Sequence, residues 1–204
     1  MESVLAKDKA YEENCAKLIL IKEGIYDLEE TLIIKCPISI IGAGQDKTII
    51  QRHGIEIKGP EKEKKRVNMQ GMTMKGSISC GLYASFGLSF LCKDMTFTQC
   101  EYSGVAARDT KGRLINCVIT QCGWSGIYCW ENALIELEGE QTKVDGNVTS
   151  GGSGLYTFST SSRIHLLFPL TKESVSTNHL CGGNYNSRGT IQTVDSFEPL
   201  LNKK

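Results

Sequence analysis

The chain has 204 residues with 23 basic and 23 acidic side chains, a length that fits one domain. Balanced charge excludes the basic patch that nucleic acid or an anionic membrane requires, and no apolar run approaches the ~18 residues of a membrane span. We therefore expect neither partner. Asp8, Glu12 and Glu13 interrupt the region where a secretory signal would be apolar, so we expect a cytoplasmic protein.

The first 16 residues predict a short capping helix. Residues 3–14 place Val4, Leu5 and Ala10 on one helical face. A helix there would cover the first strand edge of the domain, and natural proteins protect such edges against aggregation. Short strands are expected next, separated by glycine-containing turns, at residues 18–21, 31–34, 38–41 and 48–50.

Two later segments alternate apolar and polar residues, GIEIK at 54–58 and LIELE at 134–138. A period of two is typical of β-strands with one face buried and the other face exposed. The chain therefore predicts an all-β domain made of short strands.

A short motif recurs through the middle of the chain: a small residue, glycine, an aliphatic residue, then tyrosine or alanine. Its glycines, Gly81, Gly104, Gly126 and Gly154, are spaced by 23, 22 and 28 residues. Helical repeats of this length would space their apolar residues by three and four. Strand-forming repeats of about two dozen residues instead predict coils that stack one on the next.

A second motif keeps the same period, because the segments that begin at Met72, Met95 and Cys117 are spaced by 23 and 22 residues. Both motifs together predict a right-handed parallel β-helix, a solenoid of coils of about 22–23 residues. We assign residues 1–204 to this single domain, with a cap at 1–16, coils at 17–194 and a C-terminal tail or cap at 195–204. The last strand is expected at residues 190–194.

Nine cysteines are many for this length, yet no paired CxxC or CxxH spacing is present. The thiols are therefore expected to be reduced and to serve as small apolar side chains, with Cys100 stacked on Cys122. No metal site is expected from cysteine. The sequon at Asn147 is expected to be idle.

The run from residue 22 to residue 50, together with the recurring glycine motif, resembles the pectin-lyase-like superfamily of right-handed parallel β-helices. It is closest in style to the intracellular eukaryotic members, the Shc-binding-protein/Nessun Dorma group and the F-box β-helix proteins. This resemblance implies a recognition platform for a protein partner or a glycan. The polygalacturonase, pectin methylesterase and epimerase motifs of the superfamily are absent from the sequence, and fold alone does not define activity.

Strand alternation after each glycine predicts one outer face that combines aromatic and charged residues: Tyr83, Arg108, Asp109, Tyr128, Trp130, Glu131, Tyr156 and Phe158. Exposed aromatic residues in one patch are typical of a contact surface. They also fit a ladder of rings that stabilises the fold.

These residues predict a non-catalytic binding or scaffold module for a protein or glycan. One alternative is a carbohydrate-active lyase or hydrolase that uses Asp109, Glu131 and Arg108. No cofactor is expected, although Asp109 and Glu131 on adjacent coils suit a shared Ca²⁺. A second alternative is a purely structural repeat, viral or part of a longer protein.

Overall fold

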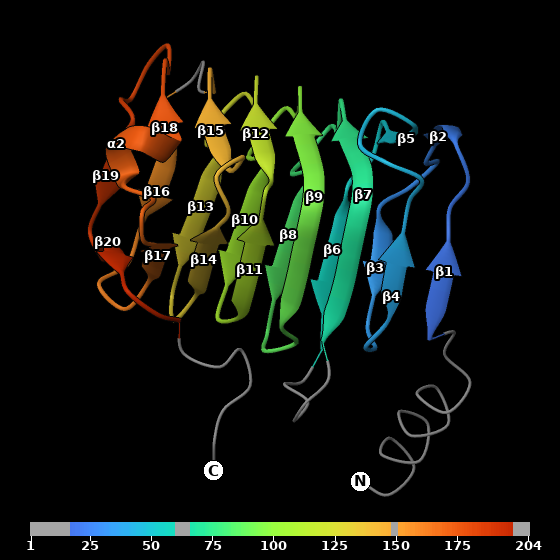
Figure 1. The fold of residues 1–204 in the computed structure, drawn as a ribbon, viewed down its shortest axis with the longest axis horizontal. Helices are drawn as coiled ribbons and strands as arrows, with labels where there is room; N and C mark the ends of the chain where they lie inside the picture. The colour runs from blue at the N-terminus through green and yellow to red at the C-terminus, as the bar shows by residue number, and fades with distance from the viewer. Residues whose placement is uncertain (1–16, 60–65, 148–150, 198–204) are drawn as a thin grey trace, which may run out of the picture.

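The computed structural model describes residues 17–59, 66–147 and 151–197. These residues form a parallel β-solenoid of about seven turns (Figure 1), which confirms the predicted all-β solenoid. The cap predicted at residues 1–16 lies outside the described residues.

Three ladders of strands build the solenoid, and the thirteen-stranded sheet contains two of them. Its first ladder runs through β1 (Leu18–Leu20), β4 (Ser39–Ile41), β7 (Val67–Lys75), β9 (Phe90–Thr98), β11 (Lys111–Ile115), β14 (Leu134–Glu138), β17 (Arg163–Leu167) and β20 (Thr190–Val194). Its second ladder shares β7 and β9 and adds β2 (Gly24–Asp27), β5 (Thr48–Gln51), β12 (Val118–Thr120), β15 (Lys143–Asp145) and β18 (Ser176–Thr177).

The seven-stranded sheet is the third ladder, and it carries the candidate site. Its strands, in spatial order, are β3 (Leu32–Ile34), β6 (Ile55–Lys58), β8 (Leu82–Ser85), β10 (Val105–Arg108), β13 (Ile127–Trp130), β16 (Leu155–Thr157) and β19 (Tyr185–Ser187). Neighbouring strands pair in parallel, because each is the equivalent segment of the next coil.

The register confirms the period predicted from the glycine motif. Leu82 pairs with Val105, Val105 with Ile127, and Ile127 with Leu155. All four side chains are 0% exposed. The apolar positions of the motif therefore form one column through the interior of the solenoid.

The glycines of the motif are explained by close packing between the second and third ladders. A Cβ atom on Gly104 would overlap the Ile119 side chain, and one on Gly126 would overlap Val144. A larger residue at either position would push β12 or β15 away from the core.

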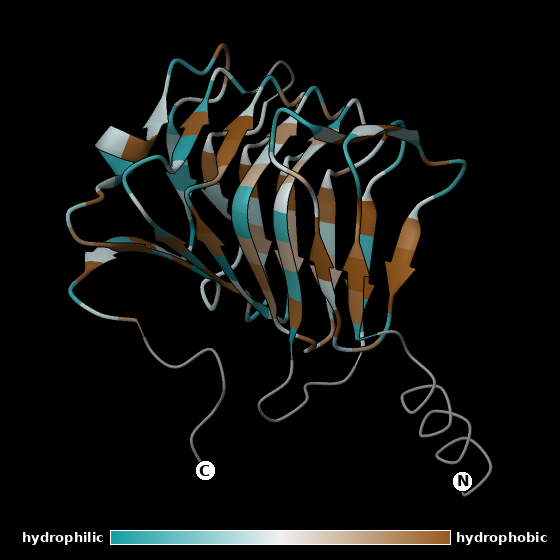
Figure 2. Cartoon of the chain, turned by 45° about the vertical axis from the view of Figure 1, so that its right-hand side comes forward, coloured by the Kyte–Doolittle hydropathy of each residue, from teal (hydrophilic) through white to brown (hydrophobic). Residues whose placement is uncertain are grey.

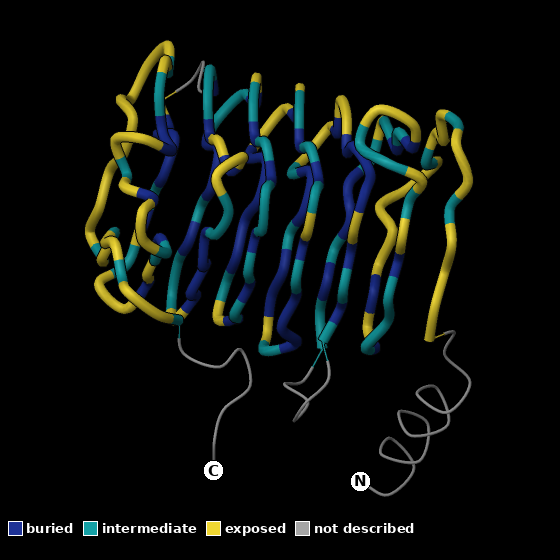
Figure 3. Tube along the Cα trace, in the orientation of Figure 1, coloured by how far each residue is buried: buried dark blue, intermediate teal, exposed yellow. Residues whose placement is uncertain are grey.

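The middle coils are buried more completely than the two ends, as Figure 3 shows. Large side chains such as Phe90, Phe97 and Met95 are 0% exposed, and burying each of them contributes about 1.5–3 kcal/mol. In the first described coil, by contrast, Ile19 and Leu32 are each 40% exposed, although their register partners Ile40 and Ile55 are buried. Figure 2 shows the apolar colour of β1 in this coil.

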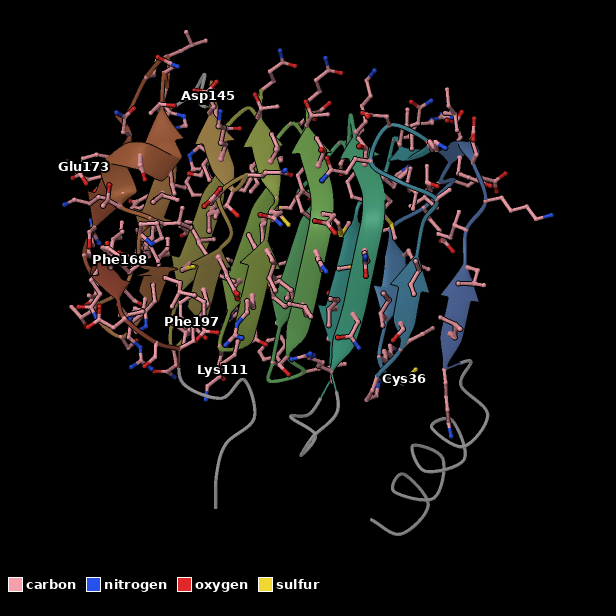
Figure 4. The ribbon with its side chains drawn as sticks, viewed as in Figure 1. Cys36, Lys111, Asp145, Phe168, Glu173 and Phe197 are labelled. Carbon is pink, nitrogen blue, oxygen red and sulfur yellow. The ribbon has the colours of Figure 1, made fainter. Side chains whose placement is uncertain are left out.

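The last coil contains the only helix among the described residues, α2 (Lys172–Val175). A capping box at Thr171 begins it, because the Thr171 and Ser174 side chains each bond to the other's backbone amide. Beyond β20 the chain returns along the outside, where Phe197 lies against the Arg113 guanidinium with 4.6 Å from Cζ to the ring centroid (Figure 4).

Most described cysteines are free thiols inside the solenoid. Cys100 and Cys122 are both buried and interact with each other, which confirms the predicted stack. Burial raises the pKa of Cys80 to about 11 and that of Cys117 to about 12, so both thiols are protonated at neutral pH. Cys36 is disulfide-bonded, so the prediction of reduced thiols throughout is wrong at this position.

Candidate functional site

The outer face of the seven-stranded sheet carries two rows of side chains, one on each side of a buried column. The first row runs, in register, through Glu56, Tyr83, Ala106, Tyr128 and Tyr156. The second row runs through Lys58, Ser85, Arg108 and Trp130, and Phe158 follows directly after β16. The structure thus brings together on one face the aromatic residues singled out in the sequence.

We call Tyr83, Tyr128, Trp130, Tyr156 and Phe158 the aromatic strip. Phe158 is 42% exposed, and the other four side chains are partly buried. Ring centroids of neighbours lie 4.7–6.3 Å apart, within the range of aromatic pairs. The strip is therefore continuous across four coils and partly exposed to solvent.

Trp130 lies between two tyrosines. Its ring is stacked on Tyr83 at 5.6 Å and 4°, and on Tyr128 at 4.7 Å and 27°. Tyr83 and Tyr128 are two coils apart, about 9.6 Å at the usual strand spacing, so the indole fills the space between them. Ala106, the small residue in that row, is 2% exposed beneath it.

The position of Trp130 was not predicted. Strand alternation indicates that its side chain points outward, but it does not indicate that the ring leans back over the neighbouring coil. The signal was the change from tyrosine to Ala106 in the fourth position of the repeated motif, which leaves room for a second ring.

Two further residues that the sequence did not single out extend the strip. Trp124, from the corner before β13, packs edge-on against Tyr128 at 4.6 Å. The Arg188 guanidinium lies 4.8 Å from the Phe158 ring centroid. Trp124 and Arg188 lie in corners between strands, and the strand pattern of the sequence does not predict how those corners fold.

The predicted charged residues are each held by a neighbour. Arg108 Nη2 lies 2.8 Å from Glu131 Oε1, and this bond is the main reason that the pKa of Arg108 is raised above its usual range. Asp109 Oδ1 accepts a hydrogen bond from the Asn132 amide at 3.1 Å. The two carboxylates thus have separate polar partners.

Asp109 and Glu131 also occupy equivalent backbone positions in adjacent coils. Both follow directly after a strand and have positive φ, 47° and 54°, as does Phe86 at 62°. These three residues turn the chain at one corner of successive coils. Across the described ranges, no group of three or more His, Cys, Asp or Glu side chains is arranged to hold a metal ion.

Beneath the strip, two polar atoms lack hydrogen-bond partners. They are the Ser85 hydroxyl and Arg108 Nε, which belong to residues paired directly across β8 and β10. Ser85 is 1% exposed. An outward-facing serine with no partner is unusual, since buried polar side chains are hydrogen-bonded in most proteins.

A second charged cluster lies on the outer face of the thirteen-stranded sheet. Arg113 pairs in register with Glu136, and Glu136 pairs with His165. Arg113 donates from Nε and Nη2 to Glu136 Oε2, each at 2.8 Å. Glu136 is 1% exposed although it faces outward, and the ring of Phe197 covers Arg113. This arrangement ties the end of the chain to the solenoid.

The sequon residue is part of the fold. Asn147 is 0% exposed; its Oδ1 accepts from the Cys122 amide, and its Nδ2 donates to the Ile119 carbonyl. Its side chain joins one coil to the next, so an attached glycan would require that corner to open.

No protein-family model and no curated protein matches this chain. No helix in the described part of the chain is long and apolar enough to cross a membrane.

Proposed function

We propose that this protein is a non-catalytic binding or scaffold module of the pectin-lyase-like superfamily, and that it recognises a protein partner or a glycan on the aromatic strip. One observation carries the proposal: five partly exposed rings form a continuous strip on one outer face. Aromatic residues are enriched where proteins contact partners. The seven-turn parallel solenoid supports the superfamily assignment.

The arrangement of charges favours binding over catalysis. An acid/base mechanism on this face would use Asp109, Glu131 and Arg108, but Arg108 and Glu131 neutralise each other at 2.8 Å. A general base must reach the proton that it abstracts, and the Glu131 carboxylate is already paired with the Arg108 guanidinium.

The purely structural alternative has an observation in its favour, because the rings of the strip pack on one another. Stacked pairs contribute about 0.5–1.5 kcal/mol beyond their buried area. Stability and binding must therefore be measured on the same variants.

The test compares Trp130→Ala with Phe168→Ala. Phe168 is 68% exposed and follows β17 of the other sheet, so its removal takes away an exposed ring outside the strip. Each variant is applied to a glycan array, with and without calcium, and to affinity capture from lysate.

We expect Trp130→Ala to lose partners that Phe168→Ala retains while the folded fraction at the assay temperature is unchanged. Equal binding by the wild type and both variants would contradict the proposal. A change in melting temperature alone would favour the structural alternative.

A further inference from the structure

The two unpartnered polar atoms beneath the strip lie on adjacent strands. Ser85 Oγ and Arg108 Nε are two of the three buried side-chain polar atoms that lack a partner in the described ranges. Their residues are register neighbours, about 4.8 Å apart between strands. Both atoms donate hydrogen bonds, so a single acceptor oxygen placed between them would satisfy both.

Glu131 does not engage every hydrogen-bond donor of the Arg108 guanidinium. Glu131 Oε1 lies 2.8 Å from Arg108 Nη2, whereas Arg108 Nε takes part in no hydrogen bond. A guanidinium binds a carboxylate best through two parallel N–H···O bonds, which the Nε and Nη2 edge provides. The Arg108 and Glu131 side chains are 37% and 44% exposed, and exposed ion pairs are weak. A partner's carboxylate that engages both Nε and Nη2 can therefore take the place of Glu131.

We propose that Ser85 and Arg108 form a subsite for the carboxylate of an acidic side chain on a protein partner, with Glu131 as an internal competitor. The inference rests on the proposed binding function of the strip. In the complex, the partner's carboxylate accepts from Arg108 Nε and Nη2 and from the Ser85 hydroxyl. Glu131 is released to solvent, and Phe86, 55% exposed with its ring centroid 5.1 Å from Arg108 Cζ, turns aside.

A protein partner fits this face better than an acidic sugar does. Sugar rings stack on the flat faces of aromatic side chains, but Trp130 is stacked with Tyr83 and with Tyr128. Both faces of the Trp130 ring are therefore occupied, whereas apolar side chains of a protein can pack against the partly exposed rings without a free face. Lys58, in register beside Ser85, is paired with Glu56 at 3.2 Å, which leaves Arg108 as the cation of the subsite.

The experiment uses the full chain and an array of octapeptides, each with one glutamate among apolar residues. The glutamine version of each peptide is the matched probe. Dissociation constants of the best pair are then measured by fluorescence polarisation for the wild type and for Ser85→Ala, Arg108→Lys, Glu131→Gln and Trp130→Ala. Arg52→Lys, in an exposed pair of the second coil, is the control.

We expect the glutamate peptide to bind about tenfold or more tightly than its glutamine version, because only the carboxylate completes the charged pair. Glu131→Gln should strengthen binding about threefold or more by removing the competitor. Arg108→Lys should weaken it about tenfold, since lysine lacks the fork of donors. Ser85→Ala should weaken it without loss of stability, and Arg52→Lys should change nothing.

Equal binding of the glutamate and glutamine peptides would overturn the subsite, as would Glu131→Gln binding no more tightly than the wild type. If both peptides bind equally and Trp130→Ala abolishes both, the subsite fails while the strip remains a binding surface. If Trp130→Ala changes nothing, the proposed function fails as well. Preferential binding of oligogalacturonate over the glutamate peptide would overturn the choice of a protein partner.

Discussion

The middle coils and the terminal coils of this solenoid share one repeat but differ in what their apolar residues do. In the middle, the aliphatic residue of the motif is sealed inside, as at Ile127, which is 0% exposed. In the first described coil, Leu32 stands in the same column, in register with Ile55 and through it with Leu82, yet it is 40% exposed. Among the described residues, a coil buries its apolar side chains completely where other coils flank it on both sides, so the same column is closed in the middle coils and partly exposed in the first described coil.

The largest expected effect comes from truncation inside a middle coil. Ile127→Ala should lower the free energy of unfolding by about 2–5 kcal/mol, because it leaves a cavity in a packed column. Leu32→Ala, at the equivalent position of the first described coil, should lower it by only about 1 kcal/mol, because that side chain is already 40% exposed. Urea denaturation followed by circular dichroism measures both, and similar losses for the two variants would refute the contrast between coils.

A smaller effect on stability is expected at Ala106, the position on the outer face where the repeated motif has alanine instead of tyrosine. Ala106→Tyr restores the tyrosine of the motif but takes the space of the Trp130 ring. Overpacking should cost about 1–3 kcal/mol, and the displaced indole should emit at longer wavelength. Fluorescence is recorded in a Trp124→Phe background, with Ala106→Ser as the control. An unshifted spectrum would show that the ring does not depend on Ala106.

The smallest effect is expected in the last coil and depends on pH. His179 Nδ1 accepts from the Asn147 amide at 3.0 Å, and Nε2 lies 2.9 Å from the Ser176 hydroxyl. Burial lowers the pKa of His179 below its ordinary value of 6.5. The unfolded chain therefore binds this proton at a higher pH than the folded chain does, so stability is complete above pH 6.5 and falls as the pH drops below it.

His179→Gln should flatten the loss of stability between pH 7.5 and pH 5, measured by urea unfolding. Asp145 also contributes to the pH dependence of stability, but in a separate, more acidic range. Its pKa is lowered, chiefly by the hydrogen bond from Thr177, so its contribution is lost only as the pH falls below the ordinary carboxyl range. An unaltered pH profile in His179→Gln would contradict the assignment.

The repeat made the interior predictable from the sequence. Equivalent positions must stack when coils share a period, so the column through Leu82, Val105 and Ile127 followed from the spacing alone. The strand at residues 190–194 was predicted with the bounds of β20. The outer face was predicted less completely, because alternation fixes which side a residue faces but leaves its rotamer and its neighbours open.

Three features of the outer faces show this limit. Trp130 leans over Ala106, Arg108 pairs with Glu131 across one coil, and Glu136 is buried although it faces outward. Each depends on a side chain or segment that reaches across coils. The return of the chain to place Phe197 on Arg113 leaves no periodic signal in the sequence.

The most direct test of the aromatic strip as a contact surface is photo-cross-linking at two exposed phenylalanines. A benzoylphenylalanine replaces either Phe158, 42% exposed in the strip, or Phe168, 68% exposed outside it, and each protein is irradiated in lysate. We predict a discrete cross-linked partner from position 158, lost when Trp130→Ala is added, and none of the same mass from position 168. The same partner from both positions, or from position 168 alone, would contradict the account.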